Sequence, residues 1–174
     1  MTEDDAVALI GGRPMAITPV VWADLGCGDG TFTRALATLL PAGSSIHAID
    51  QDVSALRRIP SDHRGVSIVT HPGDFTVQPW PFDGLDGVLL ANSLHYVRDQ
   101  PRFIRDCAGA MNHSGRFLVV EYDTEQANRW VPYPLSRQGL TALLRAAGFS
   151  SVEFLGSRPS IYRRSAIYSA LVER

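Results

Sequence analysis

Three glycines at alternate positions constrain the fold of this chain more than any other feature. They lie in the turn Gly26-Cys27-Gly28-Asp29-Gly30, which follows an apolar run over residues 20–25 that contains Asp24. Glycine has no Cβ and tolerates positive φ, so such a turn lets another molecule lie directly on the backbone. A helical pattern that starts at Thr31 adds unpaired N–H groups and the positive end of a helix dipole. The sequence therefore predicts a buried strand, a tight turn and a helix that bind a nucleotide-type cofactor.

The rest of the chain alternates strand and helix patterns, which is typical of an α/β fold with a mostly parallel sheet. The strand patterns cover residues 20–25, 45–50, 66–69, 85–91 and 116–122. The helix patterns cover residues 31–40, 52–56, 101–111 and 137–147, with a stop at 112–115. Residues 152–155 and 165–172 are expected to close the sheet as an antiparallel hairpin with an exposed connection at 156–164. We therefore expect a Rossmann-like, doubly wound sheet of seven strands with helices on both faces.

Composition limits the classes of function that fit the chain. A chain of 174 residues fits one domain, and its net charge of −2 gives no strongly basic surface for nucleic acid. No apolar run is long enough to span a membrane, and the acidic start lacks the basic residues of a secretory signal. Cys27 and Cys107 have neither metal-ligand spacing nor a disulfide framework, so we expect no metal and a cytoplasmic protein. The pair Arg163-Arg164 is interpreted as a solvated strand edge and not as an anion site.

Polar residues follow four of the predicted strands, at the edge of the sheet where ligands bind in such folds. The glycine turn follows the first strand, Asp50 ends the second, Asp74 follows the third, and Asn92 to His95 follow the fourth. A carboxylate at Asp50 can accept hydrogen bonds from both hydroxyls of a ribose. The alternative for Asp50 is a cap on the next turn, although Asp52 is better placed for that. Four loops that converge on one edge predict a single binding site.

The spacing of the glycines distinguishes a site for a nicotinamide dinucleotide from a site for another nucleotide-type cofactor. The dinucleotide fingerprint is G-x-G-x-x-G/A, and its last position falls on Thr31 here, which weakens a nicotinamide interpretation. The segment Asp24-Leu25-Gly26-Cys27-Gly28-Asp29-Gly30 instead resembles the first motif of class I S-adenosylmethionine (SAM)-dependent methyltransferases. Gly73-Asp74-Phe75 and Asn92-Ser93-Leu94-His95-Tyr96 resemble later segments of the same family. The resemblance covers most of residues 20–172. Within the class, the chain is similar to the enzymes that act on small molecules.

The resemblance implies SAM as the cofactor and S-adenosylhomocysteine as its product. The implied cofactor-binding residues are Asp24, Gly26, Cys27, Gly28, Asp50, Gln51, Asp74, Phe75 and Asn92. Asp24 and the turn would hold the methionine end, while Asp74 and the Phe75 N–H would meet the adenine. The open alternatives are a strand-end carboxylate for Asp24, an Asx turn for Asp74, core packing for Phe75, and a filler or nucleophilic role for Cys27.

The acceptor side of the site is less determined by the sequence. The resemblance implies that His95 lies near the transferred methyl group, where it would serve as a general base or as a packing residue. Glu121 and Asp123 are weaker candidates for a base. Tyr96, together with Trp130 and Tyr133 of the loop 123–135, would line an acceptor pocket or cover core. Only residues 1–19 stand where many relatives have a helical cap, so we expect a single domain over 1–174 whose site is covered by that loop or by a homodimer contact.

The predicted function is methyl transfer from SAM to a small or medium-sized acceptor whose accepting atom is open. An inactive SAM-binding or partner subunit with the same fold is an alternative. A nicotinamide-dependent oxidoreductase is a third hypothesis that depends on fold analogy alone. Asn92-Ser93-Leu94-His95 replaces the Asn/Asp-Pro-Pro-Tyr/Phe motif for amino groups on adenine or glutamine, and neither cysteine follows a proline as in cytosine methylation.

Overall fold

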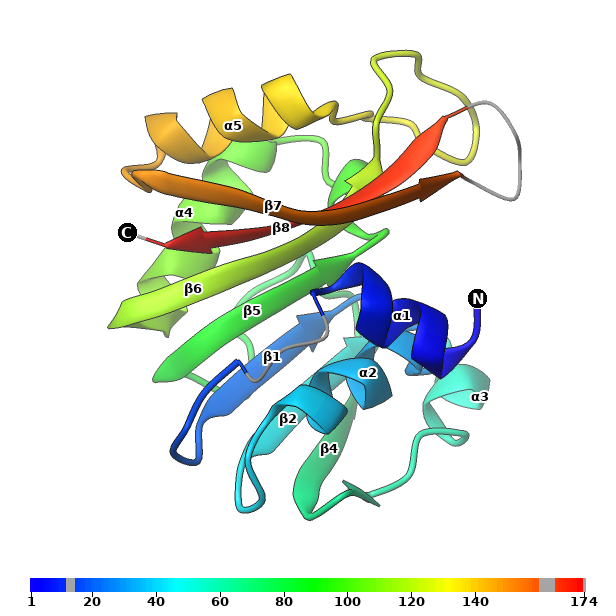
Figure 1. Cartoon of the computed structure of the whole chain (residues 1–174), viewed down its shortest axis with the longest axis vertical. Coiled ribbons are helices and arrows are strands. Elements are labelled where there is room, and N and C mark those ends of the chain that lie inside the picture. Colours follow the sequence, from blue (N-terminus) through cyan, green and yellow to red (C-terminus); the bar gives the residue numbers. More distant parts are fainter. Residues whose placement is uncertain (12–14, 160–164, 174) are drawn as a thin grey trace.

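The fold is built on one twisted sheet, shown in Figure 1, and the computed structural model describes residues 1–11, 15–159 and 165–173. Its strands are β1 Val21–Leu25, β2 Ser45–Asp50, β3 Asp62–His63, β4 Val66–Pro72, β5 Leu85–Ala91, β6 Met111–Tyr122, β7 Ser151–Pro159 and β8 Ala166–Glu173. Within the described residues the eight strands have the order β3-β4-β2-β1-β5-β6-β8-β7. The five strands from β4 to β6 are parallel, whereas β3, β8 and β7 pair antiparallel. The predicted Rossmann-like sheet with its closing hairpin is confirmed, and the two-residue β3 extends its edge.

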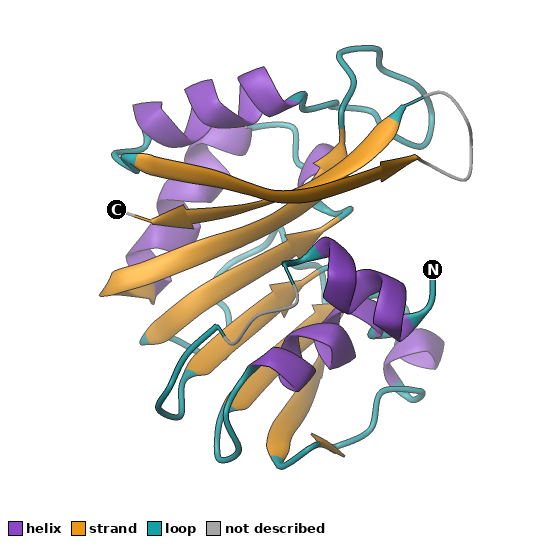
Figure 2. Cartoon of the chain, viewed as in Figure 1, coloured by secondary structure: helices purple, strands orange, loops and turns teal. Residues whose placement is uncertain are grey.

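Helices cover both faces of the sheet, as Figure 2 shows. They are α1 Glu3–Leu9, α2 Thr31–Leu39, α3 Val53–Leu56, the 3₁₀ turn η1 Leu94–Tyr96, α4 Gln100–Ala110 and α5 Arg137–Ala146. Phe103 of α4 and Leu140 of α5 belong to the apolar core of one face. Ala6 of α1 and Leu36 of α2 belong to the core of the other. The strand order changes direction between β2 and β5, so β1 lies at the switch point where ligands bind in open α/β sheets.

Helix ends follow the capping residues in the sequence. Asp52, Asp99 and Ser136 each accept a backbone N–H from the first turn of the helix that follows. Gly148, just after α5, has a φ of +87°, the left-handed conformation in which helices commonly end. These three helices therefore begin within one residue of the sequence prediction.

Two strands run further than the sequence pattern indicated. β6 begins at Met111, the last residue of the predicted helix, and includes the predicted stop at 112–115, because Met111 pairs with Leu85 beyond an irregularity in the ladder. β7 extends to Pro159 along β8, so Gly156 and Pro159 lie in a strand and the prediction of a connection there is wrong, although Pro159 is exposed as predicted and Gly156 is half-buried. The Arg163-Arg164 pair lies outside the described residues.

The N-terminal segment contains a helix that the sequence analysis did not identify. Thr2 and Asp5 form a reciprocal capping box at the start of α1. Ala6 and Ile10 are fully buried, and the Ser169 hydroxyl of β8 donates a hydrogen bond to the Leu9 carbonyl. Residues 3–9 are therefore packed on the sheet beside α2. No described helix combines the length and apolar character needed to cross a membrane.

Candidate functional site

The four loops predicted to form one site meet in space. A Cβ added to Gly26, whose φ is +82°, would lie 2.7 Å from the Cβ of Ser93 and 3.0 Å from Cε1 of Phe75. The loops that follow β1, β4 and β5 are therefore in contact. The Gly28 N–H donates to Oδ2 of Asp50 over 2.7 Å, which joins the loop after β2 to the same turn. The convergence of loops at the carboxyl ends of β1, β2, β4 and β5 is present in the structure.

Asp24 is fully buried at the end of β1. Its Oδ2 accepts a hydrogen bond of 2.6 Å from the hydroxyl of Thr33 in α2, whereas Oδ1 is buried without a partner. Burial raises the pKa of the Asp24 carboxyl to about 7, because an ion loses more than a neutral acid does when water is removed. Asp24 therefore keeps a polar atom for which the protein provides no hydrogen bond.

Two more polar atoms without partners lie after β5. Oδ1 of Asn92 and Oγ of Ser93 are buried, and Asn92 has a φ of +54°, which is uncommon for a residue with a side chain. Within the described residues only one other buried side-chain atom, Nε of Arg137, lacks a hydrogen bond. A buried polar atom without a partner costs about 1–3 kcal/mol, so these atoms need a water molecule or a ligand to complete their hydrogen bonds. The sequence analysis named Asn92 but not Ser93 as a binding residue.

The space above the glycine turn is open. A Cβ added to Gly28, whose φ is +55°, would meet no atom within 4 Å. The Asp50 carboxylate beside it accepts from the N–H groups of Gly28 and Asp52, and Gln51 is exposed. Each carboxylate oxygen has more than one acceptor site, so Asp50 can hold the turn and still accept from a ligand. The cap that begins α3 is Asp52, as expected.

Asp74 and Phe75 lie at the same edge but in a less open arrangement. Oδ1 of Asp74 accepts from both the N–H and the hydroxyl of Thr76, which is the Asx-type turn left open by the sequence. The Phe75 ring is buried and packs edge-on against Phe103, 5.9 Å between centroids. Phe75 therefore belongs to the core and also to the wall of the glycine turn. Burial raises the pKa of the Cys27 thiol, which fits a filler in the turn and opposes a nucleophile.

His95 forms a buried pair with Glu121. The side chains are 2% and 0% exposed, and Nδ1 of His95 lies 2.7 Å from Oε2 of Glu121. The Glu121 carboxylate also accepts the backbone N–H groups of His95 and Tyr122. The sequence analysis identifies Glu121 only as a weaker candidate for a general base, because no strand or helix pattern pairs two residues that lie 26 positions apart.

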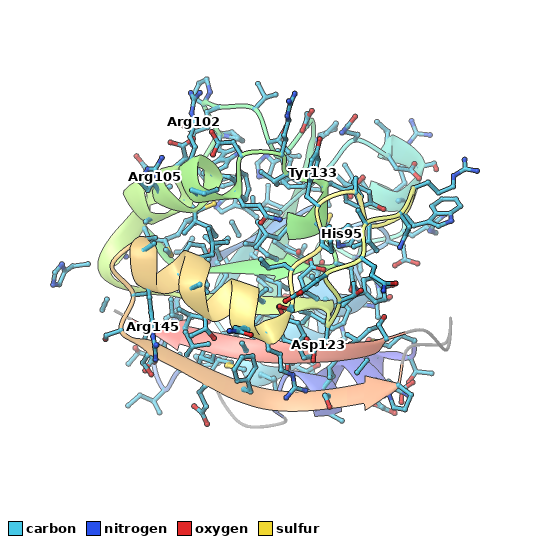
Figure 3. The ribbon with its side chains drawn as sticks, turned by 90° about the horizontal axis from the view of Figure 1, so that it is seen from above. His95, Arg102, Arg105, Asp123, Tyr133 and Arg145 are labelled. Atoms are coloured by element: carbon cyan, nitrogen blue, oxygen red, sulfur yellow. The ribbon has the colours of Figure 1, made fainter. Side chains whose placement is uncertain are left out.

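The loop 123–135 is held against η1. The Tyr133 N–H donates to the His95 carbonyl, and the Gln100 side-chain amide donates to the carbonyls of Leu94 and Tyr133. Figure 3 shows His95 and Tyr133 beside this loop. Tyr96 is 51% exposed, Tyr133 38% and Trp130 68%, so all three aromatic residues predicted to line an acceptor pocket reach the surface.

A separate cavity of about 580 Å³ lies between residues 78–83 and the second half of α4, lined in part by Trp80 and Arg105. It contains none of the strand-end residues described above. Within the described residues no cluster of three or more His, Cys, Asp or Glu side chains could hold a metal ion. The polar groups that await a ligand are therefore those at the ends of β1 and β5.

Comparison with known proteins agrees with this arrangement. Residues 23–117, more than half of the chain, match the family described as a methyltransferase domain. The chain belongs to this family. Among similar methyltransferases, the demethylmenaquinone methyltransferase of Clavibacter sepedonicus is 29% identical over 154 residues, which cover 84% of this chain and 58% of that protein. An uncharacterized methyltransferase of Mycobacterium tuberculosis is 29% identical over 101 residues, 58% of this chain and 50% of that protein.

A solved methyltransferase shares the fold. The 1,6-didemethyltoxoflavin-N1-methyltransferase of Burkholderia thailandensis, solved with 1,6-didemethyltoxoflavin and S-adenosylhomocysteine, has a TM-score of 0.68 at 19% identity and covers 99% of this chain and 77% of that one. This methyltransferase domain spans about half the length of the curated relatives that it matches.

Proposed function

We propose that this protein transfers a methyl group from SAM to a small acceptor. The proposal depends most on the three buried atoms without partners, Oδ1 of Asp24, Oδ1 of Asn92 and Oγ of Ser93, beside an open glycine turn at the switch point. Membership of the methyltransferase-domain family supports it. The relatives are named for small acceptors, demethylmenaquinone and 1,6-didemethyltoxoflavin, which supports a small acceptor here.

The residues present fit SAM as a ligand. Asp24 and Asn92 present acceptor oxygens, which suit an ammonium group, and Gly28 leaves room for a ligand against the backbone of the turn that it forms with Gly26 and Cys27. Asp50 with Gln51 would hold the ribose, and Asp74 with the Phe75 N–H the adenine. SAM supplies a methyl group on a positively charged sulfur, and the protein supplies position and electrostatics. With this assignment one ligand provides partners for the three unpartnered oxygens of Asp24, Asn92 and Ser93.

His95 is the proposed general base for a hydroxyl or ammonium acceptor, and Tyr96, Trp130 and Tyr133 are the proposed acceptor contacts. The near-complete burial of His95 favours a second candidate function, a SAM-binding subunit without turnover of its own. Release of S-adenosylhomocysteine by the isolated chain with any acceptor excludes that second candidate.

Calorimetry with SAM and with S-adenosylhomocysteine tests the proposed function. Both ligands should bind the wild type, and Asp50→Ala should weaken binding at least about tenfold, because charge-assisted hydrogen bonds are worth about 1.5–3 kcal/mol. Asp52→Asn is the matched control, since it retains the cap of α3 two residues away and should bind like the wild type. Lack of binding of both ligands to the wild type would refute the proposal, and binding of NADH in their place would revive the oxidoreductase.

Three broader proposals remain from the sequence: one domain over residues 1–174, a homodimer and a cytoplasmic location. The two free cysteines support the cytoplasmic location, and the one sheet of the described residues supports a single domain. Light scattering of the purified chain at several concentrations tests the homodimer, and a mass of one chain throughout would contradict it.

A further inference from the structure

The hydrogen bonds around Glu121 fix the imidazole of His95. Three N–H groups point at the two oxygens of Glu121: the backbone N–H groups of His95 and Tyr122, and Nδ1–H of His95. Each Glu121 oxygen accepts one of the two backbone N–H groups, so we assign the proton between the two side chains to Nδ1. The neutral imidazole then carries its lone pair on Nε2.

Nε2 is the ring nitrogen of His95 that does not bond to Glu121. It has no hydrogen-bond partner in the part of the chain that the structure describes, and the Tyr96 ring is tilted against the imidazole at 4.4 Å between centroids. His95 follows Asn92 and Ser93 by two or three residues in the segment after β5, which therefore carries two of the unpartnered atoms assigned to SAM as well as His95. The lone pair on Nε2 is therefore the one on His95 that remains to accept a proton from an acceptor.

We propose that Glu121 is a positioning residue that holds His95 as the base for a hydroxyl acceptor on a planar ring. This inference depends on the proposed function. In the step, the acceptor oxygen forms a bond to the methyl carbon, the carbon–sulfur bond breaks with its electron pair left on sulfur, and the hydroxyl proton passes to Nε2. The imidazolium so formed lies against the Glu121 carboxylate, which stabilises it away from water. The proton later returns from Nε2 to solvent.

The surroundings of His95 select the class of acceptor. The Glu121 carboxylate, fully buried, opposes an acceptor that arrives as an anion, and such an acceptor would need no base. Tyr96 and Tyr133 both reach the surface near His95: Tyr96 follows it in η1, and the Tyr133 backbone N–H donates to the His95 carbonyl. Aromatic side chains favour planar rings through offset and edge-to-face contacts. A neutral hydroxyl on a planar ring satisfies both conditions.

The tautomer of His95 is the first test, and it needs neither SAM nor an acceptor. Nitrogen-15 NMR of the imidazoles, assigned with His95→Gln, should show a protonated Nδ1 and a bare Nε2 in the wild type at pH 8. In Glu121→Gln an amide N–H must face either the His95 backbone N–H or Nδ1–H, so the single tautomer should be lost. Glu173→Gln, at an exposed site on β8, is the matched control and should leave the spectrum unchanged. A proton on Nε2 of the wild type would overturn the inference even if Glu121→Gln fails to fold.

The second test uses a series of substituted phenols and catechols whose hydroxyls range from weakly to strongly acidic. Calorimetry should give the same SAM affinity for Glu121→Gln as for the wild type. Methylation of weakly acidic hydroxyls should fall about 10²–10⁴-fold in His95→Gln and by at least about tenfold in Glu121→Gln, since general base catalysis is worth that range. Methylation of phenols that are already ionised should not fall in either variant, because they need no base.

The outcomes separate the two proposals. Equal losses over the whole series would indicate a merely structural role for Glu121 and overturn the inference. A wild type that binds SAM and methylates none of the phenols overturns the acceptor class while the SAM site stands. A wild type that does not bind SAM refutes the proposed function, and the NMR result still decides how Glu121 holds His95.

Discussion

Asp24 combines a binding role with a destabilising one. It is fully buried with one unpartnered oxygen, and its pKa in the folded protein is raised to about 7 from a model-peptide value of 3.8. Between these values the folded protein binds more protons than the unfolded chain, so the free energy of unfolding decreases as pH rises through this range. Above about pH 7 this contribution no longer changes. The buried carboxylate therefore opposes folding most at the pH where it is ionised for a ligand.

Asp24→Asn should stabilise the fold and weaken ligand binding. The amide oxygen can still accept from Thr33, and the cost of burying an ion is removed at about 1.4 kcal/mol for each unit of pKa shift. The gain over the wild type, measured by urea unfolding, should grow from pH 5 to pH 7 and then level off. SAM affinity should fall at least about tenfold, because a charge-assisted hydrogen bond is lost. A gain that is independent of pH would show that Asp24 is not the group that titrates.

Single residues also show what sequence alone could predict. The glycine turn and Asp50 are predicted from the residues themselves, because glycines at alternate positions and a carboxylate at the end of a strand pattern mark them, whereas the prediction of Asn92 comes from the family resemblance. Ser93 was missed, because a serine without a partner can be recognised only when its surroundings are known. Glu121 was underrated for the same reason, since its hydrogen bonds to His95 join two elements distant in sequence.

At the scale of elements, Gln100 at the start of α4 joins η1 to the loop 123–135. The side-chain amide of Gln100 donates to the Leu94 carbonyl in η1 and to the Tyr133 carbonyl in the loop 123–135. The Tyr133 N–H bonds to His95 in turn. One amide thus holds the loop beside the proposed base, and this contact could not be predicted from a strand or helix pattern.

Replacement of Gln100 by Leu should release the loop. Hydrogen exchange of residues 123–135 should become at least about tenfold faster, because two hydrogen bonds of about 1 kcal/mol each are lost. SAM affinity should remain that of the wild type, since Gln100 contacts none of the unpartnered atoms. Gln138→Leu, at an exposed site on α5, is the matched control. Unchanged exchange in Gln100→Leu would mean that the loop is held by its other contacts.

At the scale of the whole molecule, α1 joins the first and last parts of the chain. Glu3 pairs with Arg34 of α2, and Asp5 pairs with Arg158 of β7 at 2.9 Å. The α/β alternation predicted the sheet order well, because buried apolar strands and capped helices are local patterns. A helix of seven residues in which only Ala6 and Leu9 are buried carries too little local signal, so its position follows only from the packed sheet.

Gly156 shows how closely α1 approaches the sheet. A Cβ at this position in β7 would lie 2.8 Å from the backbone carbonyl of Leu9, so Gly156→Ala should displace α1 and reduce the free energy of unfolding by about 1–3 kcal/mol. Gly109→Ala is the matched control, because a Cβ there meets nothing within 4 Å and alanine should stabilise the interior of α4 by up to about 1 kcal/mol. Urea unfolding of both variants gives the signs, and hydrogen exchange of residues 3–10 should accelerate only in Gly156→Ala. If Gly156→Ala is as stable as the wild type, α1 is not packed against β7 in solution.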